Sequence, residues 1–197
     1  MILPKYSPKE VLILESVIEL FFGGAPLYSM KIADIAAEAG IGKGTVYEYF
    51  SSKEELLGKA IAYQILQEIK EISQEIVQAK DFKQCTFAIL SRISHCKHSV
   101  SPPFMLLRPE FTEANEVKKI FKEMKKTYKE IEQWLTDSFL KLGIDEGIIS
   151  AQTAKDIGQQ TVVSAFAGFH ILLHNEAYIS VEQLKENTYT IIVNSLH

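Results

Sequence analysis

Apolar residues recur along most of this chain at the period of an α-helix. In the clearest segment they are spaced at steps of three, four or seven, with lysines and glutamates between them: Val117, Phe121, Met124, Tyr128, Ile131, Leu135 and Leu142. That spacing places one apolar stripe along one face of a helix. No run alternates with a period of two for long enough to indicate a strand. The pattern therefore predicts an all-α fold.

Capping residues, glycines and prolines divide the pattern into about nine helices. Ser7 stands before Pro8 and three positions before Glu10, which is typical of a helix start, and Gly23 and Gly24 end that helix. The expected helices cover approximately residues 8–22, 31–38, 42–49, 52–78, 81–97, 102–109, 117–142, 150–175 and 180–197.

Four other positions set helix ends in this scheme. Gly40 is expected to end the second helix, because glycine tolerates a left-handed backbone there. Ser52 and Glu55 are expected to form a capping box at the start of the fourth helix. Gly143 is expected to end the seventh.

The segment "AGIGKGTVYEYF", residues 39–50, has the look of a nucleotide-binding loop but fails the test for one. A phosphate loop has the order G-x-x-x-x-G-K followed by Ser or Thr. Here Lys43 is followed by Gly44, and the position of the first glycine is occupied by Ala37. The dinucleotide pattern fails as well, since its third glycine would fall at Thr45. Both motifs also follow a buried strand, and the residues before this segment have helical spacing instead.

Composition is that of an ordinary soluble protein, and it does not advertise nucleic-acid binding. The chain has 197 residues, 47% of them hydrophobic, and a net charge of −4. Even residues 1–60 carry six lysines against eight acidic residues, so a basic surface there must come from the placement of lysines. The most apolar run, residues 162–173, is interrupted by Ser164 and His170 and is too short to span a bilayer. We therefore expect a cytoplasmic protein with no membrane contact, whose Cys85 and Cys96 are reduced.

Residues 32–50 fit a helix-turn-helix, in which a turn containing glycine joins two short helices. Ile35 and Ala36 supply the packed face of the first helix, and Ala39 is small where the helices approach. Val46 and Phe50 are expected to pack inward from the second helix. In such a motif the start of the second helix faces base edges in the major groove of DNA. An ordinary helical hairpin in an all-α core is the alternative.

Residues 11–57 resemble the N-terminal domain of the tetracycline-repressor (TetR) family of regulators. The resemblance rests on Phe21-Phe22 at the end of the first helix, on "DIAAEAGIGKGTVYEYF" and on the "SKEEL" that follows. It implies a three-helix DNA-binding domain, residues 1–52, and a helical ligand-binding and dimerisation domain, residues 53–197. It also implies a homodimer that binds a palindromic operator in double-stranded DNA and responds to a small-molecule effector.

By this resemblance, a set of residues around the second helix of the motif is expected to contact DNA: Lys31, Gly42, Lys43, Gly44, Thr45, Tyr47, Glu48, Tyr49 and Lys53. The lysines and Tyr47 would contact phosphates, and Thr45 and Glu48 would lie near base edges. The chain departs from the family at Lys31, where a Thr or Ser usually caps the helix, so the cap is expected from Ser29. It departs again at Gly42, where the family often has Ser.

The C-terminal half is expected to form the dimer and the effector site. Small residues on one stripe of the 150–175 helix, with positions on the last helix, form the expected dimer interface: Thr161, Ala165, Gly168, Leu172, Tyr189 and Ile192. The alternative is that both stripes of that helix belong to the chain's own core. Aromatic and methionine side chains, with one histidine, can line a pocket for an apolar or amphipathic ligand, or simply belong to the core: Phe87, Phe104, Met105, Phe111, Met124, Tyr128, Trp134, Phe166 and His170.

No metal site, cofactor or catalytic constellation is expected. His170 and His174 are four residues apart, and His95, Cys96 and His98 cluster elsewhere, but neither set finds a carboxylate that completes a zinc site. The sequence thus predicts a non-enzymatic DNA-binding transcriptional regulator, and the resemblance to the TetR family implies a repressor that a ligand releases. Two alternatives stay open: a DNA-binding protein with a non-transcriptional chromosomal role, and a helical enzyme or scaffold with a vestigial DNA domain.

Overall fold

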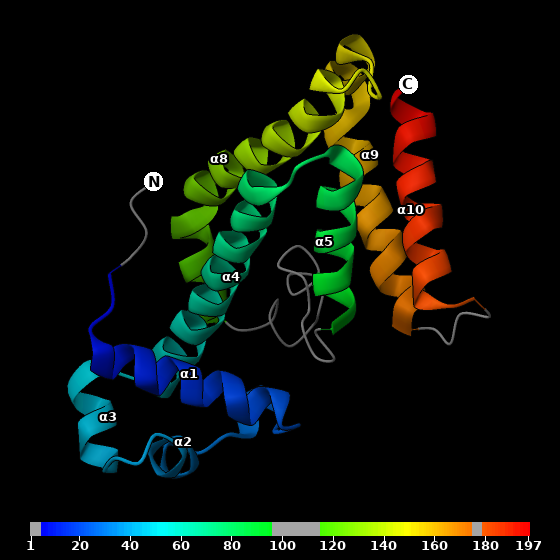
Figure 1. The fold of residues 1–197 in the computed structure, drawn as a ribbon. Helices are drawn as coiled ribbons and strands as arrows, with labels where there is room; N and C mark the ends of the chain where they lie inside the picture. Colours follow the sequence, from blue (N-terminus) through cyan, green and yellow to red (C-terminus); the bar gives the residue numbers. More distant parts are fainter. Residues whose placement is uncertain (1–4, 96–114, 175–178) are drawn as a thin grey trace. The chain divides into compact units, whose positions relative to one another are not determined.

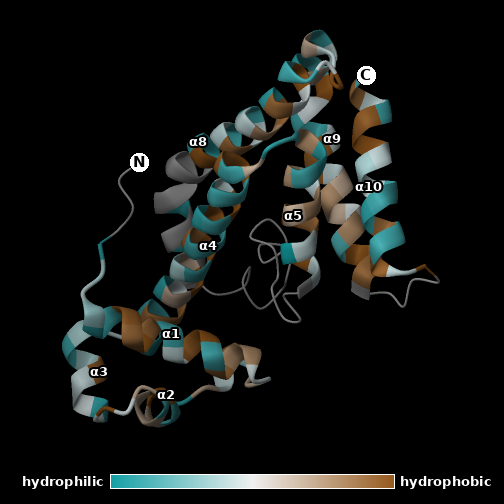
Figure 2. Cartoon of the chain, in the orientation of Figure 1, coloured by the Kyte–Doolittle hydropathy of each residue, from teal (hydrophilic) through white to brown (hydrophobic). Residues whose placement is uncertain are grey.

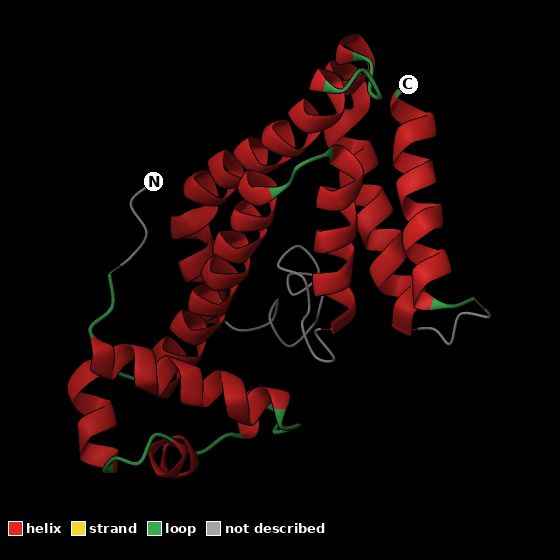
Figure 3. Cartoon of the chain, in the orientation of Figure 1, coloured by secondary structure: helices red, strands yellow, loops and turns green. Residues whose placement is uncertain are grey.

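The computed structural model describes residues 5–95, 115–174 and 179–197. The described residues form eight α-helices and one short 3₁₀ turn, with no strand among them (Figures 1 and 3). The all-α fold is therefore confirmed. The short helix expected at 102–109 lies outside the described residues.

The chain divides into two compact units. One comprises Met1–Ile69 with Ser101–Lys125, and the other Lys70–Val100 with Lys126–His197. Helices α4 (Lys53–Gln78) and α8 (Asn115–Asp145) each contribute residues to both units. The domain boundary expected between residues 52 and 53 coincides with the start of α4 and stays a prediction.

The first unit begins with three helices whose ends follow the capping signals in the sequence. They are α1 (Pro8–Phe22), α2 (Ile32–Glu38) and α3 (Lys43–Tyr49), with the 3₁₀ turn η1 (Leu27–Ser29) between the first two. Ser7 and Glu10 form the expected capping box: the Ser7 N–H donates to the Glu10 carboxylate at 2.7 Å, and the Glu10 N–H donates to Ser7 Oγ at 3.3 Å. Gly23 is the C-cap of α1.

Apolar faces of these helices form the core of the first unit. Helix α1 packs on α2, and α2 packs on α3. Ile13, Leu14 and Val17 of α1 and Ile35 of α2 have no exposed surface. At the edge of this core the hydroxyl of Tyr63, on α4, donates to Glu15 of α1 at 2.9 Å. A polar contact thus joins helix α4 to α1.

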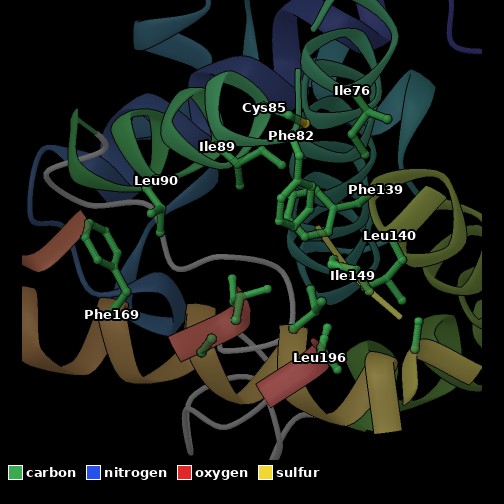
Figure 4. Packing of buried hydrophobic residues seen from close by; sticks show 14 of the residues in the cluster. Ile76, Phe82, Cys85, Ile89, Leu90, Phe139, Leu140, Ile149, Phe169 and Leu196 are labelled. Carbon is green, nitrogen blue, oxygen red and sulfur yellow. The ribbon is translucent and has the colours of Figure 1, made fainter. Parts of the chain in front are cut away.

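The second unit is built around aromatic rings from three helices. Its described helices besides the ends of α4 and α8 are α5 (Phe82–His95), α9 (Ala151–His174) and α10 (Val181–Leu196). The rings of Phe82 and Phe139 lie against each other with centroids 4.8 Å apart (Figure 4), and Phe169 and Leu196 are fully buried in the same cluster. Figure 2 shows that the helices carry both hydrophobic and hydrophilic residues, which is the amphipathic pattern such a core requires.

The expected end of the seventh helix at Gly143 is wrong. Helix α8 continues to Asp145, and the glycine with a left-handed backbone is Gly147, at φ 71°. Gly143 lies inside the helix and is buried against α5 and the segment after α8. A Cβ there would lie 2.6 Å from Ile149 Cδ1 and 3.2 Å from Phe82 Cδ2. The glycine serves close packing rather than helix termination.

Candidate nucleic-acid interface

The turn between α2 and α3 has the geometry of a glycine-ended helix. Gly40 adopts φ 63°, as expected. The Ile41 N–H donates to the Ala36 carbonyl at 2.9 Å and the Gly40 N–H to the Ala37 carbonyl at 3.1 Å. This pair of bonds satisfies the last carbonyls of α2 and reverses the chain direction. Ala39 is buried where the helices meet, which fixes the spacing between α2 and α3.

Helix α3 has a single buried residue, and most of its other side chains point outward. Val46 has no exposed surface and Phe50, which caps the helix, is 1% exposed. The inward packing of these two residues is confirmed. Tyr47 keeps 55% of its surface exposed and Tyr49 keeps 37%. The positions on this outward face are Lys43, Gly44, Tyr47, Glu48 and Tyr49, while Thr45 is half-buried.

No side chain caps the start of α3. Gly42 is its N-cap and makes no side-chain capping bond. A Cβ added at Gly42 or at Gly44 would meet no atom within 4 Å. Packing within the chain therefore does not require glycine at either position, and the space beside this helix end is open.

The start of α2 is capped by its own third residue rather than by Ser29. The Lys31 N–H donates to Asp34 Oδ2 at 3.2 Å, and the Ser29 hydroxyl donates to the Pro26 carbonyl at 2.9 Å instead. Ser29 is held in the 3₁₀ turn, so its hydroxyl is engaged there. The Lys31 side chain is exposed at this helix start.

The link from α3 to α4 only partly follows the expected capping box. The Glu55 N–H does donate to Ser52 Oγ, at 3.0 Å. The Glu55 carboxylate, however, accepts from the N–H of Ser51, at 2.7 Å, rather than from Ser52. Lys53 lies half-buried at the first position of α4. The sequence pattern thus predicted the bond from the Glu55 N–H to Ser52 correctly, but the bond to the Glu55 carboxylate comes from Ser51 instead of Ser52.

Only some of the residues expected to bind an effector are among those that the structure describes. Phe104, Met105 and Phe111, and the side chains of Met124 and Tyr128, lie outside the described residues. Of the others, Phe87 contacts Tyr189 with ring centroids 6.2 Å apart and Phe166 contacts Phe139 at 5.7 Å. Trp134 is 49% exposed, and His170 is partly buried on α9. Phe87 and Phe166 therefore pack on the core, and an effector site among these residues stays a prediction.

The expected dimer residues divide between a core face and an exposed face. Ile192 has no exposed surface and Ala165 keeps 8%, because both lie in the core of the second unit. Tyr189 is half-buried against α5, with its ring 6.0 Å from that of Phe82. Thr161 and Gly168 of α9 are half-buried, between its core face and its exposed face, and Leu172 keeps 48% of its surface exposed. Ala165 and Ile192 are thus corrected to core positions.

Sequence reasoning missed other apolar residues on the exposed face. Ile157 (43%) and Ile171 (52%) of α9 are exposed, and so is Ile191 (55%) of α10, the helix that packs beside α9. At 100° per residue, Ile157, Thr161, Gly168 and Ile171 fall within one side of α9. The sequence contains this mixture of two isoleucines and small residues, but the core stripe of α9 is equally apolar, so the pattern alone does not show which stripe is exposed.

Two further observations concern metals and membranes. Within the described part of the chain, no three His, Cys, Asp or Glu side chains converge as a metal site would require. His95 and His174 have no described side chains, and Cys96 and His98 lie outside the described residues. None of the described helices is both long enough and apolar enough to cross a membrane.

Comparison with known proteins agrees with this geometry. Residues 18–60, which include α2, α3 and the start of α4, match the model of the tetR family of bacterial regulatory proteins. No curated protein matches the chain.

Solved structures resemble it over nearly its whole length. The fatty acid degradation regulator FadR from Bacillus halodurans has 17% identity and a TM-score of 0.67, covering 96% of this chain and 97% of that one. FadR from Bacillus subtilis, in complex with stearoyl-CoA, has 20% identity and a TM-score of 0.65 over 95% and 99%. A transcriptional regulator from Saccharomonospora viridis, in complex with choline, has 18% identity and a TM-score of 0.66 over 97% and 98%. With the helix-turn-helix and its outward-facing α3 in place, residues 18–60 match the tetR family of bacterial regulatory proteins, and nearly the whole chain shares the fold of these solved regulators.

Proposed function

We propose that this protein is a transcriptional regulator that binds a palindromic operator as a homodimer and is released from it by a small-molecule effector. The observation that carries the proposal is α3. Seven residues long, it buries Val46 and keeps Lys43, Tyr47, Glu48 and Tyr49 exposed. Two exposed tyrosines close together on so short a helix favour a surface that contacts a partner. The proposal includes a cytoplasmic location, because the target is chromosomal DNA.

The outward face of α3 suits the two kinds of contact that DNA recognition needs. Lys43 and the Tyr47 hydroxyl can donate to phosphate oxygens, which sets the position of the helix on the duplex. Lys31 and Lys53 flank them at the starts of α2 and α4. Glu48 can accept from the amino group of cytosine, and Thr45 can contact a base edge or a thymine methyl group. Gly42 and Gly44 leave room for the backbone of α3 to approach the DNA.

A dimer would provide the second α3 that a palindromic operator requires. The exposed apolar side of α9, with Ile157, Ile171 and Leu172, and the neighbouring Ile191 of α10 supports a two-fold contact between copies. An effector that binds better to one arrangement of the dimer shifts the population toward it, and so changes the spacing of the two copies of α3. Repression follows when the unliganded spacing is the one that matches DNA.

The test is selection of bound duplexes from a random DNA pool, followed by titration of the recovered duplex at fixed salt. We expect Lys43→Ala and Tyr47→Ala to weaken binding by about tenfold each across all recovered sequences, as loss of a phosphate contact does. Both side chains are exposed, so the thermal midpoint of unfolding should not change. Lys80→Ala, at an exposed position in the second unit, is the matched control and should bind as the parent does.

Two results would contradict this proposal. Failure of the parent chain to enrich any duplex at low salt, where phosphate contacts are strongest, would contradict the proposal that the protein binds DNA. Unchanged affinity in both variants would remove α3 as the docking helix.

The effector arm uses the same recovered duplex. A panel that includes a long-chain acyl-CoA and choline, the molecules held by two of the similar structures, is titrated into the complex. Release by a panel member, with saturation and a matching rise in the melting temperature of the free protein, would identify the effector class. Insensitivity to a broad metabolite library would contradict ligand control.

A further inference from the structure

We propose that Glu55 is a positioning residue for DNA recognition: its side chain ties down the link between α3 and α4 and so orients the exposed face of α3. This inference rests on the proposed DNA-binding function. It concerns a residue on α4 that does not itself belong to the outward face of α3.

The contacts of Glu55 converge on the three-residue link between the helices. Its Oε2 accepts from the N–H of Ser51 at 2.7 Å and from the Ser51 hydroxyl at 2.5 Å. Its Oε1 pairs with the Lys59 ammonium at 2.6 Å, one turn further along α4. The same ammonium lies 5.6 Å from the centroid of the Phe50 ring. One carboxylate therefore connects the residue after the α3 cap to the first two turns of α4.

Helix α3 depends on this link because it has few anchors of its own. Val46 is its single buried residue, and one side chain does not prevent rotation or tilting of a two-turn helix. One end is held by the bonds around Gly40. The other end is held by buried Phe50 and by the fixed Ser51 beside it. Releasing Ser51 would leave Tyr47 and Tyr49, in the last turn of α3, the freedom to move.

The electrostatic state of Glu55 is consistent with this role. Hydrogen bonds from Lys59 and Ser51 lower the pKa of Glu55 to about 2, so the carboxylate is ionised at every pH used for DNA binding. Its negative charge is in this respect unfavourable, because DNA phosphates repel it. Neutralising the charge alone would strengthen binding, whereas loosening α3 would weaken it. Loss of charge and loosening of α3 therefore predict changes in DNA affinity of opposite sign.

The experiment measures binding of the duplex recovered with the parent chain, at a temperature well below unfolding, for Glu55→Gln, Glu55→Ala and the control Glu54→Gln. Glu54 is the exposed neighbour on the same turn, so its replacement removes the same charge. We expect Glu54→Gln to bind equally or more tightly. Glu55→Gln should bind more weakly, and Glu55→Ala weaker still, by about five- to tenfold relative to the parent.

A second readout needs no DNA. Hydrogen exchange at the Ser51 amide should be protected in the parent and in Glu54→Gln, and should accelerate in Glu55→Ala while amides in the α1 core stay protected. Equal or tighter DNA binding by both Glu55 variants would overturn the inference, and so would unchanged exchange at Ser51. If the parent chain recovers no duplex, DNA binding itself fails, and exchange at Ser51 still decides whether Glu55 holds the link.

Discussion

Val46 and Tyr47 are neighbours in the chain, yet the first has no exposed surface and the second keeps 55% of its own. Successive residues of a helix point about 100° apart, so the apolar period of α3 was enough to assign the two faces. The period fails where a residue's surroundings override its type. Lys185 is 5% exposed, with its ammonium 2.7 Å from Glu182, and no local pattern marks a lysine for burial.

Burial changes the acidity and the reactivity of the Cys85 thiol. It has no exposed surface, and burial, reinforced by the nearby charges of Glu75 and Asp81, raises the pKa of its thiol from 9.0 to about 12. We expect the native Cys96→Ser variant to react with a disulfide reagent at pH 8 at least about 10³-fold more slowly than the same chain in urea, since the thiolate is the reacting species. Rapid reaction of one thiol per chain before unfolding would contradict this.

At the scale of the element, two glycines with similar sequence surroundings have different roles. Gly40 and Gly143 each follow an apolar helical segment, and each was expected to end it. Gly40 does so with a left-handed backbone, whereas Gly143 lies inside α8. The difference is set by what packs beside the helix, Ile149 and Phe82 in the second case. Helix existence was predictable from period and caps, and this helix end was not.

We expect Gly143→Ala to lower stability, because the added methyl group would sit 2.6 Å from Ile149 Cδ1 and must displace packed side chains at a cost of about 1–3 kcal/mol. The gain in helix propensity offsets about 1 kcal/mol of that cost, so the net loss is up to about 2 kcal/mol. The measurement is denaturant unfolding. Gly44→Ala, also within a helix but with no atom within 4 Å of the new Cβ, is the control and should be neutral or slightly stabilising. A Gly143 variant as stable as the parent would show that Ile149 has room to move.

At the scale of the whole molecule, the two compact units carry separate tasks in the proposed function. The first holds the helix-turn-helix, and the second holds the aromatic core and the exposed side of α9 and α10. Self-association through the second unit would pair two copies of the first. The assignment of α9 faces shows what a sequence leaves open: both stripes are apolar, and the stripe with small residues could form a dimer contact or belong to the core.

We expect Ile171→Glu to convert a dimer into a monomer at micromolar concentration, with at least about a hundredfold rise in the dissociation constant, because a two-fold contact buries the new charge twice. Sedimentation equilibrium measures it. Val77→Glu, at a position on α4 that is 74% exposed, is the matched control and should leave the assembly unchanged. A dimer of unaltered affinity in Ile171→Glu would exclude this side of α9 from the interface.

Four features were predictable from the residues alone: the helical class, most helix boundaries, the helix-turn-helix and the inward and outward faces of α3. All of these depend on residues within a few turns of one another, through helical period, capping and backbone preference. The three-dimensional packing was needed to show that Ala165 and Ile192 are core, that Gly143 is a packing contact, and that the Glu55 carboxylate accepts from Ser51 rather than Ser52. Those outcomes depend on which segments meet in three dimensions and on small differences in geometry, and neither is encoded in a local pattern of residue types.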